Sequence, residues 1–234
     1  MSSPDPFSFY KEYPKTRPET DFWGQVTRTI NNQAVGEDQI AQIVGAIQDH
    51  LQLTPGDVLL DLGCGNGALT DRLFSKCCGG LGVDFSEYLI GIAHKYFQQL
   101  PDRTYIVGDA ADFVSTTPDT QRFTKALCYG ALQYMPADSA RMLLSSLRQR
   151  FPQVGTFFIG NLPDKEKMHE FFKGRDYQPG VENDPCSQIG IWRTEGEFKA
   201  LAAECGWAVT CSHMPKDFFG ARYRFDALLK PLLR

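Results

Sequence analysis

The sequence predicts an α/β fold in which a mostly parallel sheet is covered by helices on both faces. Short apolar segments typical of buried strands alternate with segments of helical spacing along residues 36–234. Two further apolar segments end the chain, and the loop between them is too short for a crossover helix. The last strand should therefore run antiparallel to its neighbour, whereas the earlier strands are joined by right-handed crossovers.

Periodicity and turn residues predict the individual elements. A helix begins at Glu37, because Ile40, Ile43 and Ile47 recur at helical spacing, and Pro55-Gly56 ends it. The expected strands cover 57–62, 79–84, 103–108, 123–130, 154–160, 207–214 and 221–229. The other expected helices cover 21–30, 68–76, 86–100 with Ser86 as N-cap, about 137–150, and Thr194 to Gly206 with a capping box at Thr194 and Glu197.

Composition limits the class of protein. The 234 residues suit one large domain, and 42% hydrophobic residues are enough to fill its core. The formal net charge of -4 gives no general attraction to nucleic acid or to an anionic membrane, so we expect neither partner. With no signal-peptide pattern and no apolar run of about 20 residues, we expect a cytoplasmic protein. Scattered histidines and cysteines without C-x-x-C spacing predict no metal site, and oligomeric state stays open.

Three acidic or glycine-rich motifs end three successive predicted strands. The first, residues 61–67, reads Asp-Leu-Gly-Cys-Gly-Asn-Gly, and its alternating glycines allow a sharp turn close to a ligand. Asp84 follows 21 residues after Gly63, the spacing of one βαβ unit, and a carboxylate there suits the two hydroxyls of a ribose. Asp109 ends the third strand, where it could accept from an exocyclic amine such as that of adenine, with the Ala110 N–H beside it. Their shared sheet edge predicts a nucleotide-like ligand.

These motifs resemble those of the class I S-adenosylmethionine-dependent methyltransferases. The matching segments are VLLDLGCGNG (58–67), GVD (82–84), GDA (108–110) and ALCYGALQYM (126–135), and the resemblance extends over about residues 36–212. It implies a Rossmann-like, doubly wound, seven-stranded sheet with only the last strand antiparallel, and S-adenosylmethionine as cofactor. It also implies site residues. Asp61, Gly63, Cys64 and Gly65 surround the methionine part, Asp84 holds the ribose, Phe85 packs on the adenine, Asp109 and Ala110 meet the adenine edge, and Cys128 follows the sulfonium end through its backbone.

Three other functions remain open on the residues alone. A nicotinamide-dependent oxidoreductase also has a glycine loop and an acidic second strand, but it prefers G-x-G-x-x-G, whereas here the third glycine comes early, at Gly67. A non-catalytic module would keep the cofactor pocket without turnover. An aminopropyl transferase would need an acidic pocket for a polyamine, and no carboxylate pair follows the strand at 123–130.

The acceptor side is the least determined part of the sequence. Residues 1–35 are interpreted as an N-terminal lid segment, with Arg28 on the same helix as Phe22 and Trp23 and able to pair with the cofactor carboxylate. The alternative is a helix that only packs on the sheet edge, with Arg28 in solvent. The domain covers 36–234, with an acceptor-side insertion around 161–192 that is long for a connection. We expect O-methylation of a hydroxyl on a small organic acceptor, such as a sugar or natural product, with N-methylation of a small amine as the alternative. His169 and His213 are the candidate bases, although proximity alone could suffice for an amine.

Overall fold

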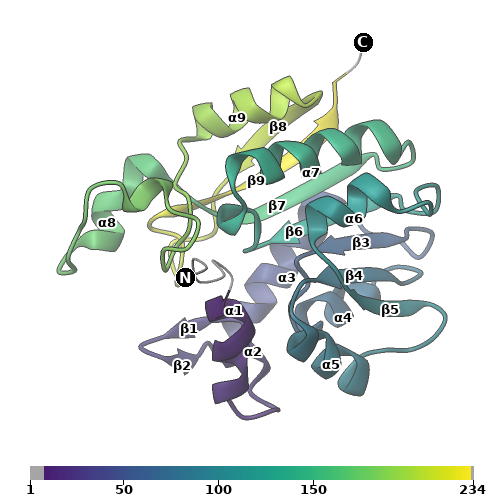
Figure 1. Cartoon of the computed structure of the whole chain (residues 1–234), viewed down its shortest axis with the longest axis horizontal. Helices are drawn as coiled ribbons and strands as arrows, with labels where there is room; N and C mark the ends of the chain where they lie inside the picture. Colours follow the sequence, from purple (N-terminus) through teal and green to yellow (C-terminus); the bar gives the residue numbers. More distant parts are fainter. Residues whose placement is uncertain (1–7, 233–234) are drawn as a thin grey trace, which may run out of the picture.

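The computed structural model of this chain describes residues 8–232 and is built around one seven-stranded sheet between two layers of helices (Figure 1). The first seven residues of the expected lid segment and the last two of the domain lie outside the described residues. The strand order is β5-β4-β3-β6-β7-β9-β8. The strands are β3 (Leu59–Leu62), β4 (Gly80–Asp84), β5 (Arg103–Val107), β6 (Lys125–Tyr129), β7 (Thr156–Pro163), β8 (Trp207–Ser212) and β9 (Arg224–Pro231).

The direction of the strands confirms the predicted fold class. Every neighbouring pair from β5 to β7 is parallel, and β9 is antiparallel to both β7 and β8. The chain builds outward from β3 to β5 and then returns to the other side of β3 to place β6. Between β3 and β6 the connections therefore leave in opposite directions, which opens a crevice at the carboxyl ends of these strands.

Alternating side chains join the two helical layers to the sheet. Leu60 and Leu62 of β3 point into one apolar cluster, whereas Leu59 points into the other, as a strand period of two requires. The first cluster packs under α6 (Ala110–Thr116), α7 (Ala137–Arg150) and α9 (Glu195–Glu204). The second packs under α3 (Glu37–Leu51), α4 (Ala68–Phe74) and α5 (Glu87–Tyr96) (Figure 1). Both faces of the sheet are covered, as predicted.

The N-cap residues in the sequence correctly predicted where two of the helices begin. The Ser86 side chain accepts from the Leu89 N–H at the start of α5, and the predicted capping box of Thr194 and Glu197 starts α9. The helix α6 was not predicted. It has only seven residues, too short for a clear helical period, and its start is signalled only by Asp109 as N-cap.

The expected helix over 21–30 is wrong. The helix α2 (Phe22–Gln25) is one turn long, and the chain then forms a hairpin of β1 (Thr29–Ile30) and β2 (Gln33–Ala34). Asn31 and Asn32 turn this hairpin with φ angles of 50° and 64°, a conformation that asparagine tolerates better than most residues. Arg28 therefore lies after the helix rather than on it.

The insertion around 161–192 has little regular structure. It begins at an irregularity in β7, contains α8 (Met168–Phe172) and otherwise consists of short turns. Its apolar centre is a small separate cluster of Phe171, Ile189 and Trp192.

The first helix of the described residues is α1 (Ser8–Glu12). None of the helices within residues 8–232 is long and apolar enough to cross a bilayer.

Candidate functional site

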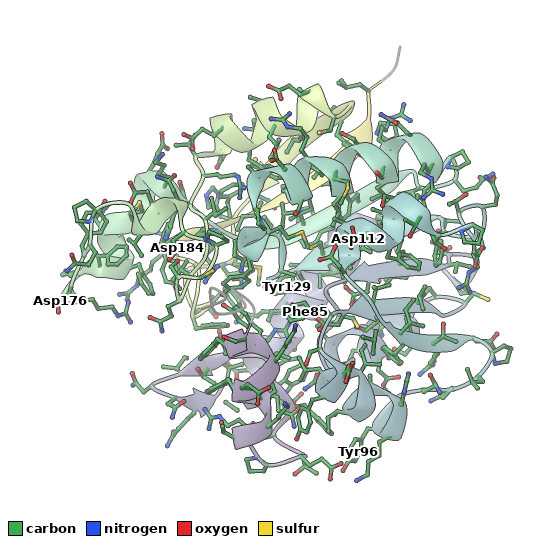
Figure 2. All side chains as sticks on the ribbon, in the orientation of Figure 1. Phe85, Tyr96, Asp112, Tyr129, Asp176 and Asp184 are labelled. Carbon is green, nitrogen blue, oxygen red and sulfur yellow. The ribbon has the colours of Figure 1, made fainter. Side chains whose placement is uncertain are left out.

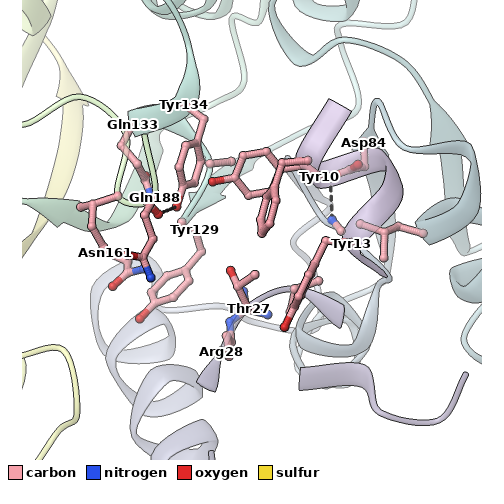
Figure 3. A pocket seen from close by; sticks show the side chains of 18 of the residues that line it. Tyr10, Tyr13, Thr27, Arg28, Asp84, Tyr129, Gln133, Tyr134, Asn161 and Gln188 are labelled. Atoms are coloured by element: carbon pink, nitrogen blue, oxygen red, sulfur yellow. Dashed lines mark hydrogen bonds between the residues drawn. The ribbon is translucent and has the colours of Figure 1, made fainter. Parts of the chain in front are cut away.

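A cavity of about 590 Å³ opens at the carboxyl ends of β3, β4 and β6. Its loop half is lined by Gly63, Cys64, Gly65, Asp84, Phe85, Asp109 and Ala110. Its aromatic half is lined by Tyr10, Tyr129, Gln133, Tyr134, Asn161, Phe171, Arg175, Gln188, Ile189, Tyr223 and Arg224. Figure 3 looks into it, with Asp84 at one side and Asn161 and Gln188 at the other. Residues of the N-terminal segment, among them Arg28, form part of the wall.

The loop after β3 can adopt its path only with glycines. Gly63 has φ of 84°, and a Cβ there would lie 2.4 Å from the Ala131 Cβ. Gly65 has φ of 59°, and a Cβ there would lie 2.9 Å from Cγ1 of Val26 in the N-terminal segment. Both distances are too short for real contacts, so the glycines allow two other segments to close on the loop. The result is a narrow cradle of backbone groups at the floor of the loop half.

Asp84 presents an oriented carboxylate in this cradle. Its Oδ2 accepts from the Gly65 N–H at 2.9 Å (Figure 3). Its Oδ1 accepts from the Ser86 N–H, also at 2.9 Å. Burial raises the pKa of Asp84 to about 6, and the two backbone hydrogen bonds oppose this by favouring the charged form. Each oxygen keeps a second lone pair, so the carboxylate can accept from two further hydroxyls. This is the geometry that a ribose diol requires.

The residues for which the resemblance implies contact with the adenine lie next to Asp84 on the wall of the loop half. Phe85 follows it directly, and Asp109 and Ala110 come from the end of β5. The Asp109 Oδ1 accepts from the N–H groups of Ala111 and Asp112, at 2.9 and 3.0 Å, and so caps α6. The cap leaves Oδ2 as the oxygen that can meet an exocyclic amine. Figure 2 shows Phe85 and Tyr129 near the centre of the molecule, in contrast to Asp176 and Asp184 in the outlying insertion.

Arg28 enters the cavity wall from the N-terminal segment. Its guanidinium lies 5.8 Å from the ring centroid of Trp23 and 5.6 Å from that of Tyr129. Burial lowers its pKa, and the nearby Tyr129 and Asp61 oppose that shift. A cation at this position suits the carboxylate of an amino-acid ligand.

Two of the residues implied by the motifs lie behind the cavity wall. Asp61 is buried and accepts from the Thr70 hydroxyl at 2.5 Å, and burial raises its pKa to about 7 against the opposing effects of Thr70 and Arg28. Cys128 is fully buried, and the next three residues line the cavity in its place. Neither side chain lines the cavity, and Asp61 lies close enough to Arg28 for their charges to interact.

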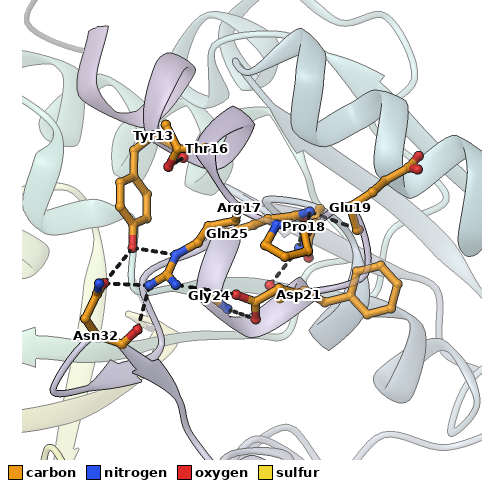
Figure 4. Close-up of polar contacts among 11 residues, drawn as sticks. Tyr13, Thr16, Arg17, Pro18, Glu19, Asp21, Gly24, Gln25 and Asn32 are labelled. Atoms are coloured by element: carbon orange, nitrogen blue, oxygen red, sulfur yellow. Dashed lines mark hydrogen bonds and ion pairs between the residues drawn. The ribbon is translucent and has the colours of Figure 1, made fainter.

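The N-terminal segment is tied to the loop by an asparagine that the sequence analysis did not single out. The Asn66 amide donates to the Phe22 carbonyl at 2.7 Å and to the Gln25 side chain at 2.8 Å. The buried Gln25 donates in turn to the carbonyls of Pro18 and Glu19, at 3.0 and 2.9 Å (Figure 4). The only sequence signal for this contact is a polar, non-glycine residue inside a glycine-rich turn.

A second network holds the hairpin to the preceding turns. Arg17 donates to the Tyr13 hydroxyl at 3.0 Å and to the Asn32 backbone and side-chain oxygens at 2.8 and 2.6 Å (Figure 4). Tyr13 and Asn32 also line the cavity. The N-terminal segment therefore covers the loop half as one connected unit of residues 8–34.

The candidate bases His169 and His213 do not line the cavity. The His169 side chain is 72% exposed, and its Nε2 lies 3.3 Å from Glu170. Phe171 of the same helix faces the cavity, and two helical steps of about 100° point His169 the opposite way. The His213 Nε2 lies 2.9 Å from the Lys167 ammonium. The expectation that α8 would bring His169 over the strand ends is therefore corrected.

The aromatic half combines closely packed aromatic rings with polar groups. Tyr10 and Tyr134 have ring centroids 4.5 Å apart, and the Tyr134 hydroxyl donates to the Gln188 carbonyl at 3.2 Å (Figure 3). The buried Tyr129 hydroxyl and the Gln133 Oε1 have no hydrogen-bond partner among the described residues. Buried polar atoms of this kind are usually satisfied by water or a ligand. This half can therefore hold a planar organic molecule that carries polar groups.

Comparisons of the sequence with known proteins find methyltransferases. Residues 59–153 match the family model described as a methyltransferase domain. The chain is 35% identical over 88 residues to a ubiquinone biosynthesis O-methyltransferase of Coxiella burnetii, a match covering 38% of this chain and 36% of that protein. It is 29% identical over 150 residues to a probable ribosomal RNA small subunit methyltransferase A of Methanosarcina acetivorans, covering 57% and 54%. The chain thus spans about a third to a half of the length of these relatives.

The comparison with solved structures gives the fold of a methyltransferase. The magnesium protoporphyrin IX methyltransferase from Synechocystis PCC 6803 with bound S-adenosylhomocysteine superposes with a TM-score of 0.64 at 16% identity, over 96% of this chain and 99% of that one. The matched region, 59–153, contains the glycine loop, Asp84 and Asp109. Residues 59–153 thus match a methyltransferase domain, and the motifs and sheet order of the chain are similar to those of the class I S-adenosylmethionine-dependent methyltransferases.

Proposed function

We propose that this protein transfers the methyl group of S-adenosylmethionine to an oxygen atom of a small organic acceptor. The observation that carries the proposal is the continuous cavity, whose loop half suits the cofactor and whose aromatic half suits a second, planar molecule. Methyl transfer is an in-line displacement, so two adjacent compartments that align donor and acceptor supply much of what the reaction needs.

The proposed cofactor contacts follow the loop half. Asp84 accepts from the ribose hydroxyls, and the Gly63–Gly65 backbone surrounds the methionine part. Phe85, Asp109 and Ala110 receive the adenine, and Arg28 pairs with the carboxylate. The cofactor supplies an activated methyl group on a sulfonium; the protein's own residues bind it, orient it and keep water away.

We assign residues 8–34, within the predicted N-terminal segment, the role of a lid. Val26 closes on Gly65, Asn66 holds Phe22 and Gln25, and Arg28 reaches the interior wall. A closed lid excludes water from the reacting atoms and strengthens the electrostatic contacts of the bound ligands. It also favours a small acceptor over a polymer, which would need an open groove.

The two histidines lie outside the cavity, so the proposed chemistry no longer uses a histidine base. Of the described residues that line the cavity, none is a histidine. An acceptor oxygen that is already nucleophilic, or one activated by position, fits the aromatic half better than a hydroxyl paired with His169. The reaction class, O-methylation of a small molecule, is unchanged; N-methylation of a small amine is the second candidate, because an amine also needs no base.

The test is a two-step measurement on the purified chain. Calorimetry should give one S-adenosylhomocysteine bound per chain and no binding of NADH. A screen of small carboxylic acids, phenols, alcohols and amines, read by S-adenosylhomocysteine release and mass spectrometry, should then give an O-methylated product. Preference for NADH, or cofactor binding with methylation of ribosomal RNA only, would contradict the proposal.

A further inference from the structure

Two arginines line the aromatic half, and neither forms an ion pair within 4 Å with a described carboxylate. The Arg224 Nη1 donates to the Asn161 carbonyl at 2.6 Å, and its guanidinium lies 5.1 Å from the Tyr223 ring centroid. The Arg175 Nη1 donates to the Phe171 carbonyl at 2.5 Å, and its guanidinium lies 4.2 Å from the Phe171 ring centroid. Within residues 8–232 no carboxylate comes within 4 Å of either guanidinium nitrogen. Each guanidinium has five N–H donors, so most remain for a ligand.

The charges along the cavity are divided between its halves. Among the described lining residues the acids are Asp84 and Asp109, and both belong to the loop half. Asp226 is close enough to Arg224 that the guanidinium opposes the rise of its pKa, but Asp226 is buried and does not line the cavity. Its Oδ1 accepts from the Asn161 N–H at 2.7 Å. Arg28 is the cation placed for the cofactor's own carboxylate. Arg224 and Arg175 therefore leave the aromatic half positively charged, which favours an anionic ligand.

Among the described residues that line it, the same half has no base for a neutral hydroxyl. Its titratable groups other than the arginines are tyrosines, and burial raises the pKa of Tyr10 and of Tyr129 far above its ordinary value. These phenols stay protonated at neutral pH. A carboxylic acid needs no base, because its ordinary pKa near 4 leaves it ionised.

We propose that the methyl acceptor is an organic carboxylic acid with a planar apolar body, and that Arg224, with Arg175 at the rim, binds its carboxylate. This inference rests on the proposed methyltransferase function and names its substrate class. One carboxylate oxygen forms the bond to the methyl carbon while the carbon–sulfur bond breaks and its electron pair stays on sulfur. The products are a methyl ester and a neutral thioether, and no proton moves. The apolar body packs against the rings of Tyr10 and Tyr134, whose centroids lie 4.5 Å apart with the ring planes tilted by 51°.

The binding test uses 2-naphthoate and its uncharged amide, 2-naphthamide, titrated into the protein saturated with S-adenosylhomocysteine. The proposal predicts that naphthoate binds about 10-fold or more tightly than naphthamide, since a hydrogen-bonded ion pair adds about 1.5–3 kcal/mol. Arg224→Gln should remove this preference, and Arg224→Lys should restore part of it. Arg222→Gln is the matched control, because Arg222 is exposed, lies two residues away and does not line the cavity.

The binding experiments distinguish failure of the carboxylate proposal from failure of the proposed methyltransferase function. Equal binding of the two probes, or no binding of either at about 10 mM, would overturn the carboxylate proposal. If S-adenosylhomocysteine itself fails to bind to the wild-type chain, the proposed function fails first. Arg224 also holds the Asn161 carbonyl, so Arg175→Gln serves as a second variant if Arg224→Gln does not fold; it should weaken naphthoate and leave naphthamide unchanged.

Turnover gives an independent readout. Products from the acceptor screen should be methyl esters that release methanol in mild alkali. Their rate of formation at saturating substrates should not rise from pH about 7 to 9, because the acceptor is already ionised. The titratable groups described around this position are Arg28, Arg175, Arg224, Asp226, His50, Cys186, Tyr10, Tyr129, Tyr134 and Tyr223. An alkali-stable ether or amine product, with a rate that rises with pH, would contradict the proposal.

Discussion

Asp84 has a fixed orientation at the cavity wall, because its two oxygens accept from the Gly65 and Ser86 N–H groups. Asp84→Ala should weaken S-adenosylhomocysteine binding by more than about 10-fold, since two hydroxyls lose a charged acceptor. Calorimetry on the folded variant checks this. Asp112→Ala is the control, because Asp112 is exposed on α6 and does not line the cavity. Unchanged affinity in Asp84→Ala would remove Asp84 from the cofactor site.

The charge of Asp84 also predicts a pH dependence. Its pKa is raised by burial to about 6, so in the free protein the carboxylate becomes protonated as pH falls through that value. A protonated carboxyl loses both its charge and one acceptor position, so affinity for S-adenosylhomocysteine should fall below pH about 6. Calorimetry from pH about 5 to 8 tests this. Affinity that stays constant to pH 5 would mean that Asp84 remains ionised or does not contact the ligand.

At the residue scale, the sequence predicted the cavity wall best where a motif ends a strand. Gly63, Asp84 and Ala110 lie where the spacing of the strands placed them. Asp61 and Cys128 lie behind the wall, since a motif does not reveal which face of a strand each side chain occupies. Arg224 could not be found from sequence, because its role depends on the pairing of β9 with β7.

At the element scale, the lid packs on the domain through Phe22, Trp23 and Gln25 but contributes no strand to the seven-stranded sheet, so it should be separable from the domain. The seven-stranded sheet and its helices do not include residues 8–34. Removal of residues 1–32 should therefore leave a folded protein that binds S-adenosylhomocysteine at least about 10-fold more weakly, because Arg28 and the covering wall are lost. Circular dichroism and calorimetry check the two parts. A truncated protein that binds as tightly as the full chain would exclude the lid role.

The position of α8 gives a prediction opposite to the one made from sequence. His169→Ala and His213→Ala should each change single-turnover rates by less than about fivefold, whereas loss of a general base costs about 10²–10⁴. Both side chains lie outside the cavity, and His169 is largely exposed. A loss of about 100-fold in either variant would show that the insertion rearranges around the acceptor and brings a histidine to it.

The elements that the sequence missed share one physical cause. The helix α6 and the hairpin β1–β2 are short, so neither contains a full period of apolar residues. The hairpin depends on two asparagines with positive φ, and residues 22–30 also carry a helical pattern of apolar side chains. The long elements, such as α3 and α7, were predicted because their apolar faces repeat over several turns.

At the scale of the whole molecule, buried carboxylates set the pH dependence of stability. Burial raises the pKa of Asp61 to about 7 and those of Asp84 and Asp226 to about 6. Above the unfolded value near 4, the folded state then binds more protons than the unfolded state, so stability falls as pH rises toward 7. Urea unfolding of the ligand-free protein should give a free energy lower at pH about 7.5 than at 5, by on the order of 1 kcal/mol or more.

A matched variant tests the origin of that effect. Asp226→Asn keeps an oxygen that can accept from the Asn161 N–H but cannot ionise. It should reduce the loss of stability between pH about 5 and 7.5, whereas Asp138→Asn, on an exposed position of α7, should not. Stability that rises over this range in the wild-type chain would mean that the three buried carboxylates are ionised at lower pH than their burial requires.

The division of the cavity into a loop half for the cofactor and an aromatic half for an anionic acceptor is the central claim. A crystal structure with S-adenosylhomocysteine tests it most directly. We predict that the ribose contacts Asp84, that the amino-acid carboxylate contacts Arg28, and that the sulfur faces the half that holds Arg224, whose guanidinium stays free of the ligand. A bound ligand whose carboxylate contacts Arg224, or whose adenosine lies in the aromatic half, would contradict the claim.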